Sequence, residues 1–264
     1  MASEKTRNAS NLEALGAERL AELLIEISDG NAATKRRLRL ELPDAESPNE
    51  LAKRLFAANH ADEAWRTIEA AEHRDTRWLN FDWKDARIDV LGALGRKDDT
   101  QAARWSCFER ALSARHLRAY LQQLPDFDDV EAEERAMVFA ERHGSLLLAI
   151  SFLVSWPALS RTARVVIDRA TELDGNHYEI LTPAAEALSG KHALAATLLL
   201  RAMNDFTLTQ SRTSRYRHAV RHLLVCASLA PAVADFGTVE PHDAYVARLR
   251  KEHGRKSAFW SSTS

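Results

Sequence analysis

The sequence predicts an all-α protein, and three observations support this prediction. Only 9 glycines and 7 prolines occur among 264 residues, and these two residue types interrupt helices most strongly. Alanine and leucine, which favour helices, are abundant throughout the chain. No stretch alternates between apolar and polar residues over more than a few positions, so no strand is expected.

An N-terminal helical segment is predicted over residues 1–45. Ser10 and Glu13 have the spacing of a capping box, which marks the start of a helix. The apolar residues that follow lie on one helical face until Asp29-Gly30 ends the pattern. A short basic helix is then expected over Lys35–Leu42.

A helical-repeat array is predicted over residues 46–230. It starts at Ser47, which is followed by proline and then by glutamate at the third helical position. Turns are expected near residues 72–80, 95–99, 125–129, 156–157, 174–176, 190 and 209–213. Pro183 lies inside a helical pattern, so it predicts either a helix that begins near Thr182 or a kink.

Three segments of this array share the pattern small-x-x-x-apolar-x-x-alanine. The copies are Ala64/Ile68/Ala71, Ala163/Ile167/Ala170 and Ala195/Leu199/Ala202, with a degenerate copy at Arg104/Phe108/Ala111. The pattern resembles the second helix of a tetratricopeptide repeat, in which the central apolar residue fills the space between two helices. The prediction is therefore an α-α superhelix of degenerate tetratricopeptide-like hairpins, with a generic α-α bundle or solenoid as the alternative.

Residues 231–264, after the prolines at 231 and 241, are predicted to form a C-terminal capping helix and tail. Cys107 and Cys226 both lie in apolar helical stretches, so free buried thiols are expected. That expectation, and an N-terminus without an apolar signal region, favour a cytoplasmic location. The longest apolar run, residues 146–154, is too short to span a membrane.

The most distinctive charge pattern lies in the last third of the chain. Two basic segments interleave arginine and lysine with aromatic residues, a composition that can hold a nucleic-acid backbone and stack bases. The candidate binding surface consists of Arg212, Arg215, Tyr216, Arg217, His218, Arg221, His253, Arg255 and Lys256. Convergence of Arg215, His218 and His253 on one concave surface would support a site, whereas burial against carboxylates would indicate a scaffold.

Structural interpretations compete with this surface. The arginines of the last helices are expected to pair with the acidic stretch at residues 126–134, or with Glu240 and Asp243. The aromatic residues Tyr216, Tyr245, Phe259 and Trp260 are expected to close the last helical layer. In the acidic stretch itself, Asp128 or Asp129 is predicted to cap a helix whose first turn carries the glutamates.

His218, His222 and Cys226 share one helical face at a spacing of four residues, and ligands at this spacing can bind a transition metal. The sequence indicates no further metal ligand, so the favoured interpretation is that His222 and Cys226 pack against a neighbouring part of the fold. No nucleotide-binding, nucleophile-elbow or metalloprotease motif occurs in the sequence. The prediction is therefore a protein without a cofactor or a bound metal.

Three stretches together resemble an uncharacterised bacterial family, a domain of unknown function of the DUF6880 type. They are residues 11–42, residues 215–224 and residues 245–260. The last two also resemble the C-terminal helical region of SWIM zinc-finger proteins, but the cysteines of the finger are absent. The resemblance therefore implies neither zinc nor the nucleic-acid role of the finger. The short passage from Leu42 to Leu51 suggests a shortened family member.

We expect a non-enzymatic interaction module that presents a groove to a protein or peptide, because stacked helical hairpins form curved binding surfaces. The net charge of −2 gives no general reason to expect nucleic acid or a membrane as the partner. Two alternatives stay open. One is a nucleic-acid-associated protein that binds through the C-terminal basic helices, and the other is an enzyme with an unrecognised site.

Overall fold

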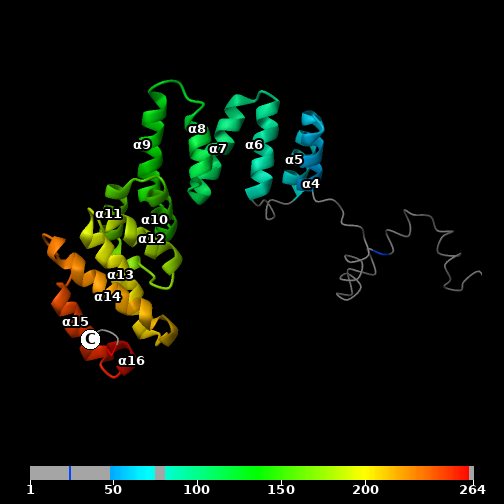
Figure 1. Cartoon of the computed structure of the whole chain (residues 1–264). Helices are drawn as coiled ribbons and strands as arrows, with labels where there is room; N and C mark the ends of the chain where they lie inside the picture. Colours follow the sequence, from blue (N-terminus) through cyan, green and yellow to red (C-terminus); the bar gives the residue numbers. More distant parts are fainter. Residues whose placement is uncertain (1–23, 25–47, 75–80, 262–264) are drawn as a thin grey trace, which may run out of the picture. The chain divides into compact units, whose positions relative to one another are not determined.

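The computed structural model of the protein describes residue 24 and residues 48–74 and 81–261 (Figure 1). All regular secondary structure in these ranges is helical, so the prediction of an all-α fold is confirmed. The predicted N-terminal capping box and the helix at Lys35–Leu42 lie outside the described residues. The described helices fall into two compact units, which are divided between Arg96 and Lys97. The predicted boundaries near residues 45 and 230 stay predictions.

The first unit contains α4 (Pro48–Ala57), α5 (Ala61–Arg74) and α6 (Phe81–Ala93). Helices α4 and α5 form a hairpin, and its turn contains Asn59 with a positive φ of 63°. Asparagine tolerates this left-handed conformation better than most residues. The core between the helices consists of Ala52, Ala64, Ile68, Trp83 and Val90.

The second unit continues as a series of helices and short 3₁₀ turns. They are α7 (Lys97–Ala111), α8 (Ala114–Leu121), α9 (Asp128–Glu141), α10 (Leu146–Ser155), α11 (Leu159–Asp168), η2 (Ala170–Glu172), α12 (Tyr178–Leu188), α13 (Ala193–Thr209), η3 (Thr213–Arg215), α14 (Tyr216–Leu229), η4 (Ala230–Ala232), α15 (His242–His253) and α16 (Ser257–Trp260).

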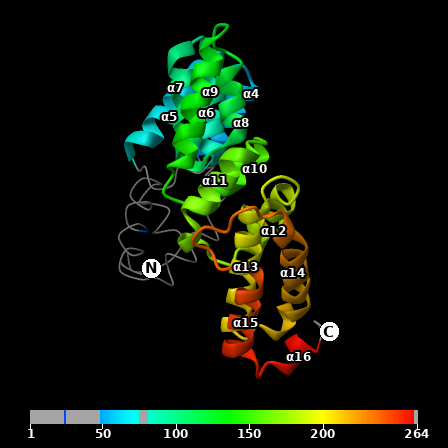
Figure 2. The same cartoon turned by 90° about the vertical axis from the view of Figure 1, so that its left-hand side faces the viewer.

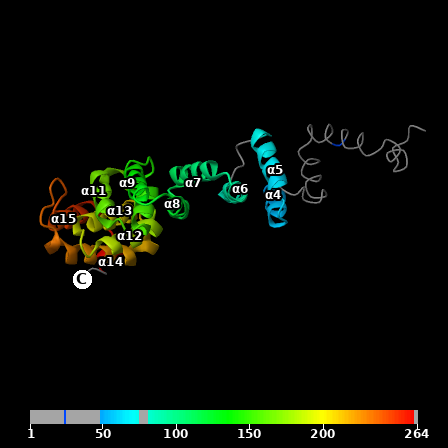
Figure 3. The same cartoon turned by 90° about the horizontal axis from the view of Figure 1, so that it is seen from above.

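Helix α13 occupies the centre of this unit. It packs against α11, α12 and α14, and in Figure 3 these helices surround it. Figure 2 shows α12, α13 and α14 running side by side, with α15 next to α13. The apolar sequence of α13 fits this position, because Leu199, Leu200 and Met203 are all buried.

Two apolar cores stabilise the second unit. One extends from α7 to α14 and includes the fully buried residues Phe108, Leu153, Leu181 and Leu199. The other closes the C-terminal end and consists of Leu208, Tyr216, Ala219, Val220, Leu223, Tyr245, Leu249 and Phe259, with Trp260 packed against it. The aromatic residues thus form the last helical layer, as one structural interpretation of the sequence predicted.

Two turns within residues 97–155 were not expected from the sequence. One separates α7 from α8 at Leu112, which has a positive φ of 47° and yet is buried. The other separates α9 from α10, where Ser145 accepts a hydrogen bond from the backbone N–H of Leu148 at 3.4 Å. Alanine and leucine continue through the first of these positions, so the local helix propensity gave no signal there.

Helix α12 runs from Tyr178 and contains Pro183 in its interior. The alternative in which the helix begins near Thr182 is therefore wrong. Proline lacks the N–H that would bond the carbonyl four residues before it, and it is tolerated best near the start of a helix. The neighbours Leu181, Ala184 and Ala185 are all buried against the core, and this packing holds the helix together around Pro183.

In most copies of the repeat pattern, the central apolar residue is buried. Ile68 of α5 and Leu199 of α13 are fully buried in the second helix of a hairpin, as the pattern predicted. Phe108 is also fully buried, but it lies in α7, the first helix of the α7–α8 hairpin. Ile167 is an exception, because it is 40% exposed while its neighbour Val166 is fully buried. The central position of that copy was therefore assigned one residue too late. Consecutive helices do pack as hairpins, and the specific tetratricopeptide-like geometry stays a prediction.

Within the part of the chain that the structure describes, no helix combines the length and apolar character needed to cross a bilayer.

Candidate functional site

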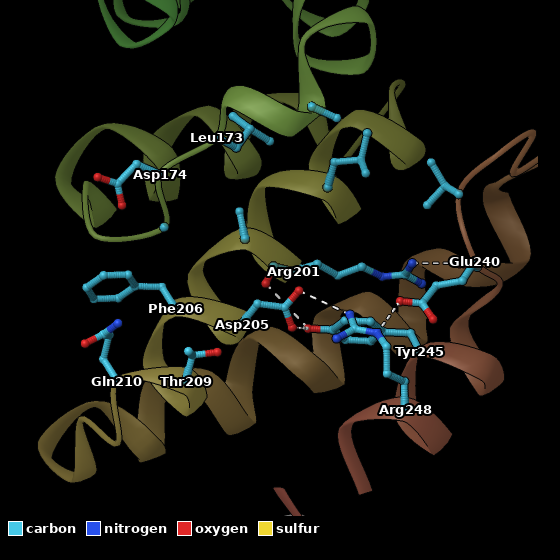
Figure 4. A pocket seen from close by; sticks show the side chains of 15 residues that line it. Leu173, Asp174, Arg201, Asp205, Phe206, Thr209, Gln210, Glu240, Tyr245 and Arg248 are labelled. Atoms are coloured by element: carbon cyan, nitrogen blue, oxygen red, sulfur yellow. Dashed lines mark hydrogen bonds and ion pairs between the residues drawn. The ribbon is translucent and has the colours of Figure 1, made fainter. Parts of the chain in front are cut away.

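Two neighbouring faces of α13 each border a pocket. The larger pocket has a volume of about 480 Å³ and lies between α13, the segment 170–175, residues 239–240 and α15. Figure 4 shows this pocket, with Leu173 and Asp174 facing α13 from the opposite side. Its apolar lining includes Leu173, Leu198 and Phe206.

The charges at one end of the larger pocket compensate one another. Arg248 of α15 donates to Asp205 of α13 at 3.2 Å and to Glu240 at 2.8 Å, and its third partner is Glu252 at 3.2 Å. The hydroxyl of Tyr245 donates to Asp205 Oδ1 at 3.0 Å. These bonds attach α15 to α13, as the dashed lines in Figure 4 show.

For Asp205 and Arg248, burial and ion pairing shift the pKa in opposite directions. Burial raises the pKa of Asp205, and the charge and hydrogen bonds of Arg248 and Tyr245 only partly offset that effect. Burial acts to lower the pKa of Arg248, but its bonds to Glu240 and Asp205 outweigh burial and raise the pKa. Burial also raises the pKa of Tyr245, which keeps its hydroxyl protonated as a donor. The network therefore serves as a structural clamp.

Arg201 is a buried cation that the sequence analysis missed. It is 5% exposed, its Nη1 donates to the carbonyl of Glu240 at 2.7 Å, and its guanidinium lies over the ring of Tyr245 at 4.4 Å. Nε and Nη2 find no hydrogen-bond partner in the described ranges. An arginine inside the apolar sequence of α13 was the available signal, because an unpaired buried charge is costly.

The smaller pocket has a volume of about 220 Å³ and borders α12, α13, η3 and α14. We call it the cationic pocket because four basic side chains line it: Arg215, His218, Arg221 and His222. Its other lining residues are Gly175, Tyr178, Thr182, Met203, Thr207 and Ser214, and none of the residues that line it is acidic. Helix α14 begins directly at this pocket, so the positive end of its dipole adds to the positive potential.

Arg215 is held in place by neighbours from the preceding turn and helix. Its guanidinium lies over the ring of Tyr178 at 4.5 Å, and Nη1 donates to Asn176 Oδ1 at 3.3 Å. The nearby carboxylates of Asp174 and Glu179 both lie next to His177, at 3.5 and 3.4 Å, instead of next to Arg215. The orientation of Arg215 is thus fixed without neutralising its charge.

His222 forms part of the pocket wall from the buried side of α14. It is 9% exposed, and its Nδ1 has no hydrogen-bond partner among the described residues. Burial, together with the nearby charges of Arg221 and His218, lowers the pKa of His222 to about 4. The imidazole is therefore neutral at pH 7.

The predicted binding surface is only partly assembled. Arg215, His218 and Arg221 converge on the cationic pocket, while Arg217 lines an adjoining concavity of about 420 Å³ that shares His218 and Arg221. Arg212 is exposed and lines neither concavity. The placement of Tyr216 on this surface was wrong, because Tyr216 is 8% exposed and packs edge-on against Phe259 at 5.9 Å.

The C-terminal members of the predicted surface lie elsewhere. The carbonyl of His253 accepts a hydrogen bond from Trp260 Nε1 at 3.0 Å, and Nζ of Lys256 donates to Ser211 Oγ at 2.6 Å. Arg255 is exposed on the turn before α16. Neither described concavity near α14 includes any of the three, so His253 does not converge with Arg215 and His218 on one concave surface.

The predicted pairing of the terminal arginines is right for Glu240, which binds Arg248, and wrong for the acidic stretch. Glu134 pairs instead with Arg161 of α11 at 2.6 Å. The predicted aspartate cap is also wrong, because the residue before α9 is Phe127 with a positive φ of 76°. Asp128 and Asp129 lie in the first turn, where negative charge still favours the helix dipole.

The favoured interpretation of the His218, His222 and Cys226 row is confirmed in its main part. Cys226 is fully buried, burial raises the pKa of its thiol to about 12, and its closest polar contact is the carbonyl of Thr197 at 4.0 Å. Cys107 is likewise buried, and neither cysteine forms a disulfide. No group of three or more histidine, cysteine or acidic residues suited to a metal occurs within residues 48–74 and 81–261.

Gly175 borders both pockets, and an alanine there is expected to destabilise the protein by about 1–3 kcal/mol. A Cβ at this position would lie 2.0 Å from the carbonyl oxygen of Ala202, so the segment would have to move away from α13. Gly190→Ala is the matched control, because a Cβ at Gly190 meets no atom within 4 Å. Urea denaturation would measure both, and an equal effect of the two substitutions would contradict the prediction.

Comparison with known proteins gave one family. Residues 2–53 and 49–262 match DUF6880, which is described as a family of unknown function. The two matched segments meet at residues 49–53, next to the passage where the sequence suggested a shortened region. Neither a curated protein nor a solved structure matches the chain.

Proposed function

This chain belongs to the DUF6880 family of unknown function, and we propose that it is a non-enzymatic helical-repeat module that binds a protein or peptide partner. The partner segment would occupy the larger pocket beside α13. The observation that supports this proposal is an open pocket with an apolar floor, at one end of which Arg248, Asp205 and Glu240 already neutralise one another.

The lining of the larger pocket suits a peptide better than a reaction. The carboxylates of Asp205 and Glu240 are both bonded to Arg248, so none of these three groups is placed as a free acid or base. Neither serine, cysteine nor histidine is among the residues that line it. Leu173, Leu198 and Phe206 offer apolar contacts to an inserted side chain. At the rim, Thr209 and Gln210 are exposed and can hydrogen-bond the backbone of an extended segment.

The proposal is tested by selecting peptides from a random displayed library with the purified full-length chain. We expect a shared consensus with at least one apolar anchor, because one side chain would enter the apolar floor. Thr209→Arg places a bulky side chain at the pocket rim, and it should weaken binding of the selected peptides by about 10-fold or more.

Ser228→Arg is the matched control, since it adds the same charge at an exposed position of α14 away from both pockets. It should change the affinity by less than about 2-fold. Selection that yields no consensus, or peptides that bind the Thr209→Arg variant as tightly as the natural chain, would refute the proposal.

The nucleic-acid alternative is favoured by one observation, the exposure of Arg212, Arg217 and Arg221. It is weakened by the burial of Tyr216 and Phe259, since buried rings cannot stack on bases. Salt-dependent retention on DNA that is lost when Arg215 and Arg217 are both changed to glutamate would support this alternative. No retention at low salt would exclude it.

A further inference from the structure

We propose that the cationic pocket binds a phosphate monoester. The inference concerns a site on a different face of α13 from the larger pocket, so it does not depend on the function proposed above. It starts from a concave group of basic side chains, Arg215, His218, Arg221 and His222, whose lining includes no carboxylate. A pocket of about 220 Å³ has room for a phosphate and a small attached group.

The two arginines are available to a ligand. Arg221 and His218 are exposed, and neither makes a hydrogen bond or an ion pair within the described part of the chain. Arg215 uses Nη1 for Asn176 and lies over Tyr178, which leaves its Nε and Nη2 groups as oriented donors. Two planar guanidinium groups match the oxygens of a phosphate and the charge of its dianion.

His222 supplies the second, independent observation. It is more than nine-tenths buried, it lines the pocket, and its Nδ1 lacks a partner among the described residues. Its pKa is lowered first by burial and then by the uncompensated charges of Arg221 and His218. The positive charges of Arg221 and His218 repel a proton on His222 because no negative charge lines the pocket. An anion bound between these groups would reduce that repulsion.

Neutral donors complete the site. The hydroxyls of Ser214 and Tyr178 belong to residues that line the pocket and are exposed, so they can donate to phosphate oxygens. The N-terminal end of the 14-residue helix α14 contributes its dipole in the same direction. A carboxylate would satisfy only part of this set, because it carries one charge and two acceptor oxygens, whereas a phosphate monoester carries close to two charges and three free oxygens.

The phosphate can belong to a free small molecule or to a phosphorylated side chain of a partner. The shared chemistry is the same in both cases, because the residues described contact the phosphate group itself. Isothermal titration of the full-length chain with inorganic phosphate, glycerol phosphate and a blocked peptide with a central phosphoserine distinguishes the sources. If the phosphopeptide binds more tightly than inorganic phosphate and glycerol phosphate, the site is assigned to phosphorylated segments. If glycerol phosphate binds more tightly than inorganic phosphate and the peptide, the site is assigned to small esters.

The test uses two variants that remove one positive charge each. Arg221→Gln removes a side chain that lines the cationic pocket, and it should weaken binding of the tightest of the three probes by about 10-fold or more. Arg217→Gln removes an exposed charge on the same helix outside the pocket lining, and it should weaken binding by less than about 3-fold. Both positions are exposed, so both variants should remain folded.

A second readout is the side-chain NMR signals of the histidines. Addition of the phosphate probe should shift the imidazole signals of His218 and His222 and leave that of His253 unchanged. Equal weakening by the two arginine variants, no heat of binding with any probe, or tighter binding of a dinucleotide phosphodiester than of every monoester would each overturn the proposal.

Discussion

Replacing Phe259 with alanine is expected to lower the free energy of unfolding of the C-terminal layer by about 3–5 kcal/mol. Phe259 is fully buried although α16 is only one turn long. Its ring meets those of Tyr216 at 5.9 Å and Trp260 at 4.9 Å, both edge-on. Removal of the ring would leave a cavity between α14 and α16 that these few residues cannot fill.

Hydrogen exchange of the backbone amides in α14 and α15 would locate this loss, and urea denaturation would give its size. Leu224→Ala is the matched control, because Leu224 is also a large apolar residue of this region but is 56% exposed. It should cost less than about 1 kcal/mol. A loss at Phe259→Ala no larger than that of the control would show that α16 does not stabilise the layer.

The cationic pocket depends on this layer. Tyr216 begins α14 and packs on Phe259, while Arg215 and His218, its close neighbours in the sequence, line the pocket. Loosening the layer should therefore also weaken binding of a phosphate probe, although Phe259 lies outside the pocket lining. In this segment the ring of Tyr216 is buried, while the side chains of Arg217, His218 and Arg221 are exposed.

Acid is expected to destabilise the protein through His222 by at most about 3.5 kcal/mol. Burial lowers the pKa of His222 from 6.5 to about 4 in the folded state. The unfolded chain therefore takes up the proton first as the pH falls, which favours unfolding. The stabilisation by neutral His222 is complete above a pH of about 6.5 and is lost progressively down to about 4.

His222→Gln should reduce this pH dependence, because glutamine stays neutral throughout. The measurement is the free energy of unfolding of both proteins at pH 7.5 and at pH 5.0. The natural chain should lose more stability between these pH values than the variant does, whatever the baseline cost of the substitution at pH 7.5. Equal losses in the two proteins would show that His222 is not the residue responsible. His242, whose pKa is lowered chiefly by burial, contributes in the same direction to both proteins.

Local sequence patterns predicted the features that interactions within one helix determine. The scarcity of glycine and proline predicted the all-α class, and the proline after Ser47 predicted the start of α4. The repeat pattern identified the buried positions Ile68 and Leu199 from their helical spacing. The same reasoning failed at Ile167, where the buried face is rotated by one residue. A spacing rule cannot detect that rotation because it contains no information on the partner helix.

The candidate site was predicted in part. The cluster of basic residues after Arg212 was visible in the sequence, and Arg215, His218 and Arg221 do share a pocket. The sequence did not predict the burial of Tyr216, because a tyrosine in a basic segment can either stack on a base or pack in the core. Its contact with Phe259 joins positions 43 residues apart, and periodicity does not report such contacts.

By itself, the sequence determined the helical class, most of the turns and the segment that carries the uncompensated charge. Only the tertiary structure decided which residues form the pockets. Arg201 lies buried beside Tyr245 and Glu240, and Gly175 lies against the backbone of Ala202. The physical reason is that propensity and periodicity act within one helix, whereas a pocket forms where separate helices meet and leave side chains without partners.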